Sequence, residues 1–218
     1  ERMYVFKDGV QITNINGSGN PYLTVTKITD AVIPTMCWAQ SADTLIIVQE
    51  DVIPQKIVRG ATDASWSIAD LSFSYIPKYA YSLSVTQPAA TLTPDVEDGK
   101  VTLTAGASVF NSSHVDQYID ASPQGRARIV EYVSGTVVKA ITEVPFFNTD
   151  AIASGDWDLE TGYENTWSAT RGWPRSAVFY EGRLYFGGAS SRQSTLWGSR
   201  VGDFFNFDPG ESFDDAAL

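Results

Sequence analysis

The chain has 218 residues, of which 43% are hydrophobic and 12% aromatic, so it can bury a core and is not a disordered segment. Its formal net charge of −11 opposes binding to nucleic-acid phosphates. The single Cys37 excludes a disulfide within the chain. No apolar run approaches the ~20 residues that span a membrane, so no membrane contact is expected.

The start of the chain gives one expectation about processing. The first residue is Glu1 rather than Met, and no basic-then-apolar leader follows it. We therefore expect no signal peptide, and we interpret the chain as a piece of a longer protein or a processed product.

Strand signals dominate the sequence, beginning at residues 4–12. Asp8 and Gly9 separate two β-prone arms there, which predicts a hairpin because both turn residues must reach positive φ. Residues 22–28 alternate with period two, as a half-buried strand does. Long helical periodicity is absent, and at most one short helical turn is predicted, near residues 112–117.

Two β segments, at residues 42–68 and 181–207, share one plan. In each segment, a leucine lies on the first strand, and an apolar residue lies 12 positions later on the second strand. An aromatic residue follows 9 positions after that apolar residue. The residues are Leu45, Ile57 and Trp66 in one segment and Leu184, Leu196 and Phe205 in the other. One offset of 139 aligns both segments, as in parts of propeller blades, although any two hairpins can be aligned in this way. Because blades recur every ~40–50 residues, the offset implies intervening blades or an inserted domain.

The stretch between the two segments indicates an insertion. Strand patterns at residues 100–104, 126–133 and 136–141 predict a compact β module. We predict three parts of the chain. Residues 1–83 form a propeller-like sheet part, residues 84–150 form the inserted β module, and residues 151–218 return to the propeller-like sheet part. The predicted fold class is all-β, with propeller-blade-like antiparallel sheet units and an inserted small module that resembles a barrel or sandwich.

Catalytic constellations are sparse, so no catalytic, cofactor-binding or metal-binding residue is predicted. One His and one Cys exclude His-rich zinc sites and CxxC pairs, and His114 lies in a predicted turn without a nucleophile-elbow motif. Asp156, Asp158 and Glu160 alternate, so a strand would place all three on one face. Paired carboxylates serve glycoside hydrolysis, which leaves a carbohydrate-binding or glycan-degrading protein as the alternative. The other interpretation of these acids is the solvated face of a strand.

A second charge pattern lies between residues 165 and 200, where every cation is Arg and only Glu181 opposes them. Arg forms planar bidentate pairs and stacks on aromatic rings, which suits protein interfaces. A subunit or neighbour-protein interface is therefore one hypothesis, and internal ion pairing with the chain's many acids is the other. The candidate interface residues are Arg171, Trp173, Arg175, Arg183, Arg192, Trp197 and Arg200.

The same region carries a family resemblance. The stretches GWPRS at 172–176, FYEGRLYFGG at 179–188 and LWGSRVGDFFNF at 196–207 resemble the tail nozzle family of short-tailed bacteriophages, also called tail tubular protein B or stabilisation proteins. QSADTLIIV at 40–48 and GRARI at 125–129 are similar too. These motifs are structural, with no catalytic signature, so the resemblance implies a protein that is not an enzyme.

The resemblance implies a virion protein made in the host bacterial cytoplasm, of which this chain is an internal fragment. Nozzle subunits form a ring, typically of about six copies, below the portal and adaptor, and contain a propeller-like domain. The implied partners are other copies of itself, portal–adaptor proteins and tail fibre or spike proteins. DNA would pass through the channel during ejection without specific binding, since a negative wall holds DNA weakly.

Overall fold

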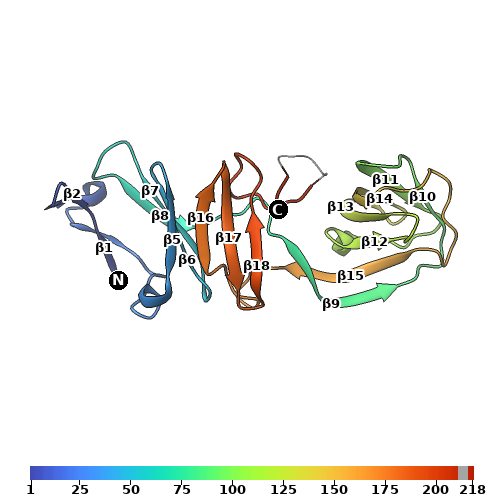
Figure 1. Ribbon diagram of the computed structural model, residues 1–218, viewed down its shortest axis with the longest axis horizontal. Helices are drawn as coiled ribbons and strands as arrows, with labels where there is room; N and C mark the ends of the chain where they lie inside the picture. The colour runs from blue at the N-terminus through green and yellow to red at the C-terminus, as the bar shows by residue number, and fades with distance from the viewer. Residues whose placement is uncertain (211–215) are drawn as a thin grey trace. The chain divides into compact units, whose positions relative to one another are not determined.

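The computed structural model describes residues 1–210 and 216–218, which form the all-β structure predicted from the sequence (Figure 1). Within this described part the helices are three short 3₁₀ segments: η1 (Ile15–Gly17), η2 (Ile33–Thr35) and η3 (Ser112–His114). The chain divides into two compact units. The first comprises Glu1–Pro77, Thr166–Asp208 and Ala217–Leu218, and the second comprises Lys78–Asn165 with Pro209, Gly210 and Ala216.

The first unit contains two larger antiparallel sheets and two short strand pairs. The four-stranded sheet has the order β5 (Cys37–Ser41), β6 (Thr44–Gln49), β7 (Val52–Arg59) and β8 (Trp66–Asp70). The three-stranded sheet has the order β16 (Ser176–Tyr180), β17 (Arg183–Ala189) and β18 (Arg192–Gly198). The short pairs are β1 (Arg2–Tyr4) with β4 (Tyr22–Thr24) and β2 (Phe6–Lys7) with β3 (Val10–Gln11).

The hairpin predicted at Asp8 and Gly9 is confirmed. Strands β2 and β3 pair antiparallel on either side of these residues, whose φ angles are 50° and 79°. Asp tolerates this left-handed region better than most residues and Gly adopts it freely, so the local sequence alone specifies the turn.

The first hairpins of the two larger sheets correspond residue for residue. Cys37 pairs with Val48 and Ser176 pairs with Gly187, so each residue of the second pair lies 139 positions after its counterpart. Ala42 and Glu181, also 139 apart, both have positive φ in the turn, at 49° and 45°. The shared offset therefore describes a shared backbone register.

The correspondence ends at the fourth strand. Trp66 begins β8, which pairs with β7, whereas Phe205 lies outside the named strands. Asn206 instead forms a parallel bridge to Tyr75, and Phe207 lies in the aromatic core. The aromatic side chains of this segment are therefore used to fill the core and not to extend the three-stranded sheet.

The core of the first unit lies between the two larger sheets. Trp167 is fully buried at its centre, with ring centroids 4.8 Å from Phe207, 5.2 Å from Trp197 and 5.4 Å from Phe186. All three contacts are edge-to-face, the arrangement that aromatic quadrupoles favour. Burial of this cluster supplies the main hydrophobic contact between the sheets.

Both faces of the four-stranded sheet pack against other segments of the first unit. Ile46 and Val48 point into the core shared with the three-stranded sheet. Ile47 and Ile57 point the other way and pack with Val25 and its neighbours in the N-terminal segment. This explains why the run LIIV at 45–48 is apolar at every position instead of alternating.

The second unit is built on one seven-stranded antiparallel sheet. Its order is β10 (Leu92–Pro94), β11 (Lys100–Ala105), β14 (Val137–Val144), β13 (Arg126–Ser134), β12 (Tyr118–Asp120), β15 (Asp158–Asn165) and β9 (Lys78–Thr86). The edge strands β10 and β9 do not pair in the described part of the chain, so the sheet does not close into a barrel. The predicted module at 84–150 falls inside this unit, whose sheet also includes β9 and β15, and the predicted helical turn corresponds to η3.

Candidate functional site

The seven candidate interface residues do not form one exposed patch. Arg183 is only 8% exposed, and its guanidinium donates a 2.7 Å hydrogen bond to the carbonyl of Ser199. Trp197 is 7% exposed and packs in the aromatic core. Trp173 is half-buried, packs against the same core, and donates its backbone N–H to the carbonyl of Glu50 at 2.8 Å.

Arg175 is the best-defined cation of the predicted set. Its Nε donates to the Glu50 carboxylate at 2.6 Å, its second guanidinium nitrogen contacts the same oxygen, and Ser190 Oγ donates to that oxygen at 2.8 Å. Hydrogen bonds from Ser190 and Arg175 hold the pKa of Glu50 below its ordinary value. This contact agrees with the alternative of internal ion pairing, and it joins the turn after β6 to the segment before β16.

The remaining candidates, Arg171, Arg192 and Arg200, are half-buried, and none is without a partner. Besides the polar Ser176, Gln193 and Ser194, the three-stranded sheet exposes large apolar side chains. Val178 and Leu196 are 53% and 65% exposed, and Tyr180 at the end of β16 is 61% exposed. Residues of β16 alternate between the two sides of the sheet: Val178 and Tyr180 share the exposed side, while Ala177 and Phe179 pack inward. This alternation is the feature of the sequence that indicates the exposed face.

A second apolar feature is a groove of about 960 Å³ on the four-stranded sheet. Its floor includes Leu45, Ile47 and Ile57, and its walls come from the N-terminal segment. Trp38 lines it and is 60% exposed. No pattern in the sequence indicates this groove, because its walls come from segments that only the fold brings together.

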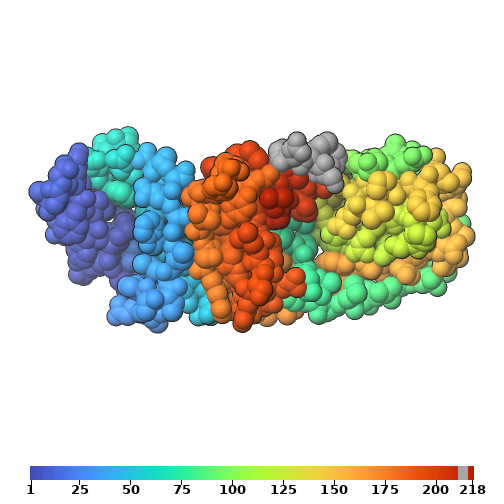
Figure 2. Space-filling view, viewed as in Figure 1, coloured from blue at the N-terminus to red at the C-terminus, as the bar shows by residue number. Residues whose placement is uncertain are grey.

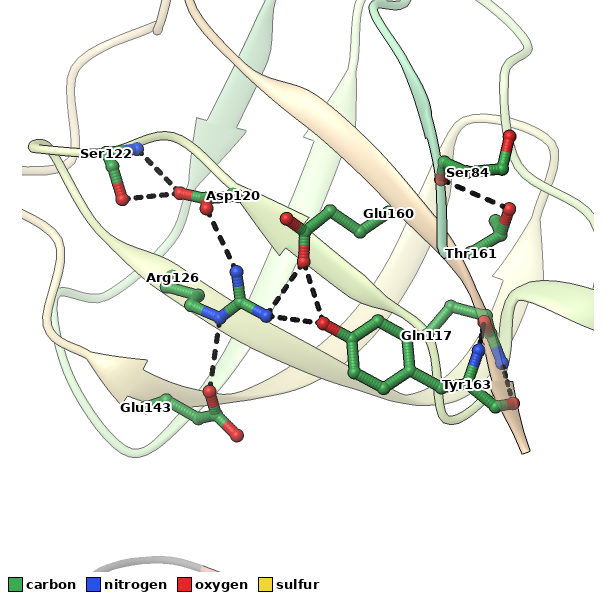
Figure 3. A network of polar contacts seen from close by, with 9 residues as sticks. All are labelled: Ser84, Gln117, Asp120, Ser122, Arg126, Glu143, Glu160, Thr161 and Tyr163. Carbon is green, nitrogen blue, oxygen red and sulfur yellow. Dashed lines mark hydrogen bonds and ion pairs between the residues drawn. The ribbon is translucent and has the colours of Figure 1, made fainter. Parts of the chain in front are cut away.

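The second unit contains a polar network centred on Arg126 (Figure 3). Its guanidinium reaches Asp120 at 2.9 Å, Glu143 at 3.2 Å and Glu160 at 2.7 Å. Tyr163 Oη accepts a 2.8 Å hydrogen bond from Arg126 and donates a 2.9 Å bond to Glu160. One cation thereby ties together four neighbouring strands, β12, β13, β14 and β15.

The electrostatics of this network follow from its three carboxylates. Burial alone would lower the pKa of Arg126, but the hydrogen bond and charge of Glu160 raise it. Burial raises the pKa of Asp120, and hydrogen bonds from Ser122 with the charge of Arg126 outweigh that effect and lower it. Burial, and then the hydrogen bond to Glu160, raises the pKa of Tyr163. These shifts favour the charged forms of Arg126 and Asp120 and the neutral form of Tyr163, which are the forms that make these contacts.

The three alternating acids have different positions. Glu160 belongs to the Arg126 network and its side chain is 13% exposed. Asp156 and Asp158 line a neighbouring polar cavity of about 450 Å³ with Asp120, which is the cross-strand partner of Asp158. Trp157 lines the same cavity but is 1% exposed and donates its indole N–H to a backbone carbonyl, so its ring offers little surface for stacking on a sugar.

His114 serves the local structure of η3. Its ring contacts the backbone N–H and side chain of Asn111, and the two residues form a capping arrangement. Burial lowers the pKa of His114. Within residues 1–210 and 216–218, no group of three His, Cys, Asp or Glu side chains could hold a metal ion, and no helix has the length and apolar character of a membrane span.

Comparison with protein-family models finds no match for the chain, and comparison with curated proteins finds none either.

Proposed function

We propose that the chain is a structural part of a bacteriophage tail nozzle, a ring subunit that helps to form the DNA ejection channel and performs no chemistry. The observation that supports this best is the stacking of two sheets whose first hairpins share one register at an offset of 139. Face-to-face packing of such repeated sheets is the arrangement of propeller blades, which the resemblance implies for this part of the chain. The second of these sheets carries the stretches that resemble the nozzle family.

Several contacts favour a structural role over a catalytic one. Arg175, Arg183 and Trp197 hold the two sheets and their core. In the second unit, Arg126 and Glu160 join strands to one another. Of the three alternating acids, Glu160 is thus engaged in an internal contact, while Val178, Tyr180 and Leu196 expose apolar surface on the three-stranded sheet, which suits assembly.

The test is electron microscopy of the purified protein that contains this sequence, with mass spectrometry of purified virions. Rings with a central channel, and the protein in the virion, are the expected results. The proposal also includes portal–adaptor and fibre or spike proteins as neighbours, which cross-linking within virions would identify. Persistent monomers, or absence of the protein from virions, would overturn the proposal.

A carbohydrate-binding or glycan-degrading tail protein is the second candidate, favoured by one observation. Asp120, Asp156 and Asp158 line one polar cavity in the second unit. Incubation with capsular polysaccharides and measurement of binding or of released reducing ends tests it. If Asp156→Asn and Asp158→Asn remove a measured activity, the second candidate replaces the first.

A further inference from the structure

One backbone pairing lies on the outer edge of the three-stranded sheet. The N–H of Gly198 donates to the carbonyl of Leu218 at 2.8 Å, and the N–H of Leu218 donates to the carbonyl of Gly198 at 2.9 Å. Such a reciprocal pair is the hydrogen-bonded unit of an antiparallel ladder. Figure 1 marks the C-terminus beside the end of β18, and Figure 2 shows the dark-red end of the chain at the surface next to the orange-red sheet. Leu218 therefore occupies a strand position on the outer edge of β18.

The backbone groups of Leu196 come next along this edge. On the inner side, β18 pairs with β17 without an irregularity from Leu196 to Gly198. In an antiparallel strand, alternate residues point their N–H and C=O to the same side, so those of Leu196 point outward as those of Gly198 do. Among the described residues, no segment outside the sheet forms a hydrogen bond with the backbone of Leu196. Leu196 thus presents an open donor and an open acceptor to a further strand.

The four-stranded sheet shows how the corresponding position is filled. The partner of Gly198 on β17 lies 139 positions after Ile46, whose own partner on β7 is Lys56. Gly198 therefore corresponds to Lys56 in its sheet, at a distance of 142 positions, because the second hairpin has three more residues between the paired positions. Lys56 pairs in turn with Ala69 of β8. Leu218 consequently takes the position that Ala69 has in the fourth strand.

The same sheet indicates which kind of residue would follow. Two positions after Ala69, the N–H of Leu71 donates to the carbonyl of Pro54 at 2.7 Å. The side chain of Leu71 is 2% exposed and belongs to the core between the two larger sheets. By the same correspondence, Leu196 has the position of Pro54. Because Leu196 is 65% exposed, an apolar residue two positions beyond Leu218 would pair with it and cover it.

We propose that the open edge of β18 binds one further antiparallel strand, and that the occupant is the polypeptide segment that continues from Leu218 in a longer form of this protein. The occupant is this segment because Leu218 already lies on the edge and directs the next residues along Leu196. Covalent continuity also keeps the effective concentration of the strand high. The inference rests on the proposed function only in treating the chain as a piece of a longer protein.

The outer edge of the four-stranded sheet is closed in a different way. The side-chain amide of Asn16 donates from Nδ2 to the carbonyl of Trp66 at 2.6 Å, and its Oδ1 accepts from the N–H of Trp66 at 2.7 Å. A side chain thus satisfies the backbone groups at the start of β8, which discourages the addition of a fifth strand there. The edge of β18 instead carries the backbone of Leu218, the arrangement that a continuing strand requires.

The test adds four residues to the 218-residue chain and measures amide hydrogen exchange at Leu196 by NMR. One extension copies residues 70–73, which are aspartate, leucine, serine and phenylalanine. The matched control extension alternates glycine and serine and stays flexible. In the parent chain the Leu196 amide is expected to exchange nearly without protection. The copied extension is expected to slow its exchange at least about tenfold, because the amide gains a hydrogen-bond partner.

The amide of Trp197 is the internal reference. It points toward β17, so it should be protected equally in all three proteins, and circular dichroism melts establish that each is folded. A Leu196 amide that is already protected in the parent chain overturns the inference, because the edge would then be closed. The inference is also overturned if the copied extension leaves Leu196 unprotected, or if the glycine–serine extension protects it equally. Ring formation and presence in virions test the proposed function separately.

Discussion

Arg175 and Glu50 lie 125 positions apart in sequence, and the Nε of Arg175 donates to the Glu50 carboxylate at 2.6 Å. Ser190 shares the same carboxylate oxygen at 2.8 Å. This contact joins the two halves of the first unit on either side of the inserted segment. It is the polar counterpart of the aromatic core that lies between the same two sheets.

Arg175→Ala is expected to lower the stability of the first unit by less than truncation of a core aromatic, because both partners are partly exposed. The effect should shrink with added salt. The folded pKa of Glu50 lies below its ordinary value of 4.5, so its contribution is fully present above pH 4.5 and is lost as the pH falls through the folded pKa. Urea midpoints at several pH values measure this, with Arg175→Lys as the conservative control. A difference between variant and parent that grows on acidification would contradict the expectation.

Trp167→Ala should cost about 4 kcal/mol of folding free energy, since it empties the centre of the aromatic cluster. Trp167→Phe should cost less than half as much. The indole N–H has no hydrogen-bond partner among the described residues, so the phenyl ring removes a buried polar group while keeping the edge-to-face contacts. Denaturant unfolding of both variants compares them. Equal losses would mean that the indole N–H makes a stabilising interaction after all.

Arg126→Ala should destabilise the second unit by about 2 kcal/mol. Breaking a fully buried ion pair costs ~3–5 kcal/mol, and solvent screening reduces this for a partly exposed side chain. The loss leaves Asp120, Glu143 and Glu160 without their shared cation. The folded pKa of Asp120 lies below 3.8 in the parent, so its contribution is present above pH 3.8 and is lost below it. The deficit of the variant should therefore narrow in acid, as measured by urea unfolding, and a deficit independent of pH would contradict the ion-pair account.

Gly162→Ala should cost at least about 3 kcal/mol, because left-handed backbone strain adds to a direct clash. The φ of Gly162 is 93°, and a Cβ there would lie 1.9 Å from the carbonyl oxygen of Ser82, at the irregularity between β15 and β9. Gly155 is the matched control, since its φ is 95° and nothing lies within 4 Å of an added Cβ. Gly155→Ala should therefore cost only the strain, about 1 kcal/mol. Thermal melts of the two variants separate the effects, and equal losses would show that the clash is relieved.

The sequence and the structure agree best where the chemistry is local. The turn at Asp8 and Gly9 depends on two residues that tolerate positive φ, and it forms where predicted. The shared offset of 139 also predicted the correspondence of β6 with β17 and of β7 with β18. The offset did not predict that Phe205 lies outside the strands and packs against the core. The local sequence does not distinguish an aromatic residue on a sheet strand from one that fills a core.

The candidate interface was the least predictable part. Arg183 and Arg175 cannot be distinguished by their local sequence. In the structure, Arg183 is buried and donates a hydrogen bond to the backbone carbonyl of Ser199, whereas Arg175 forms an ion pair with Glu50 from the opposite half of the first unit. The apolar face at Val178 and Leu196 carries ordinary strand residues, and only the stacking of the sheets determines which face of each strand stays exposed.

Local patterns in the sequence were enough to predict the all-β class, the turn at Asp8 and Gly9, and the two similar segments, since alternation and turn residues act over a few positions. The contact of Glu50 with Arg175, and the joining of four strands by Arg126, become visible only in the folded chain. The same holds for which face of each sheet is buried and which is exposed. These outcomes depend on contacts between distant segments, whose geometry is set by the packing of whole sheets.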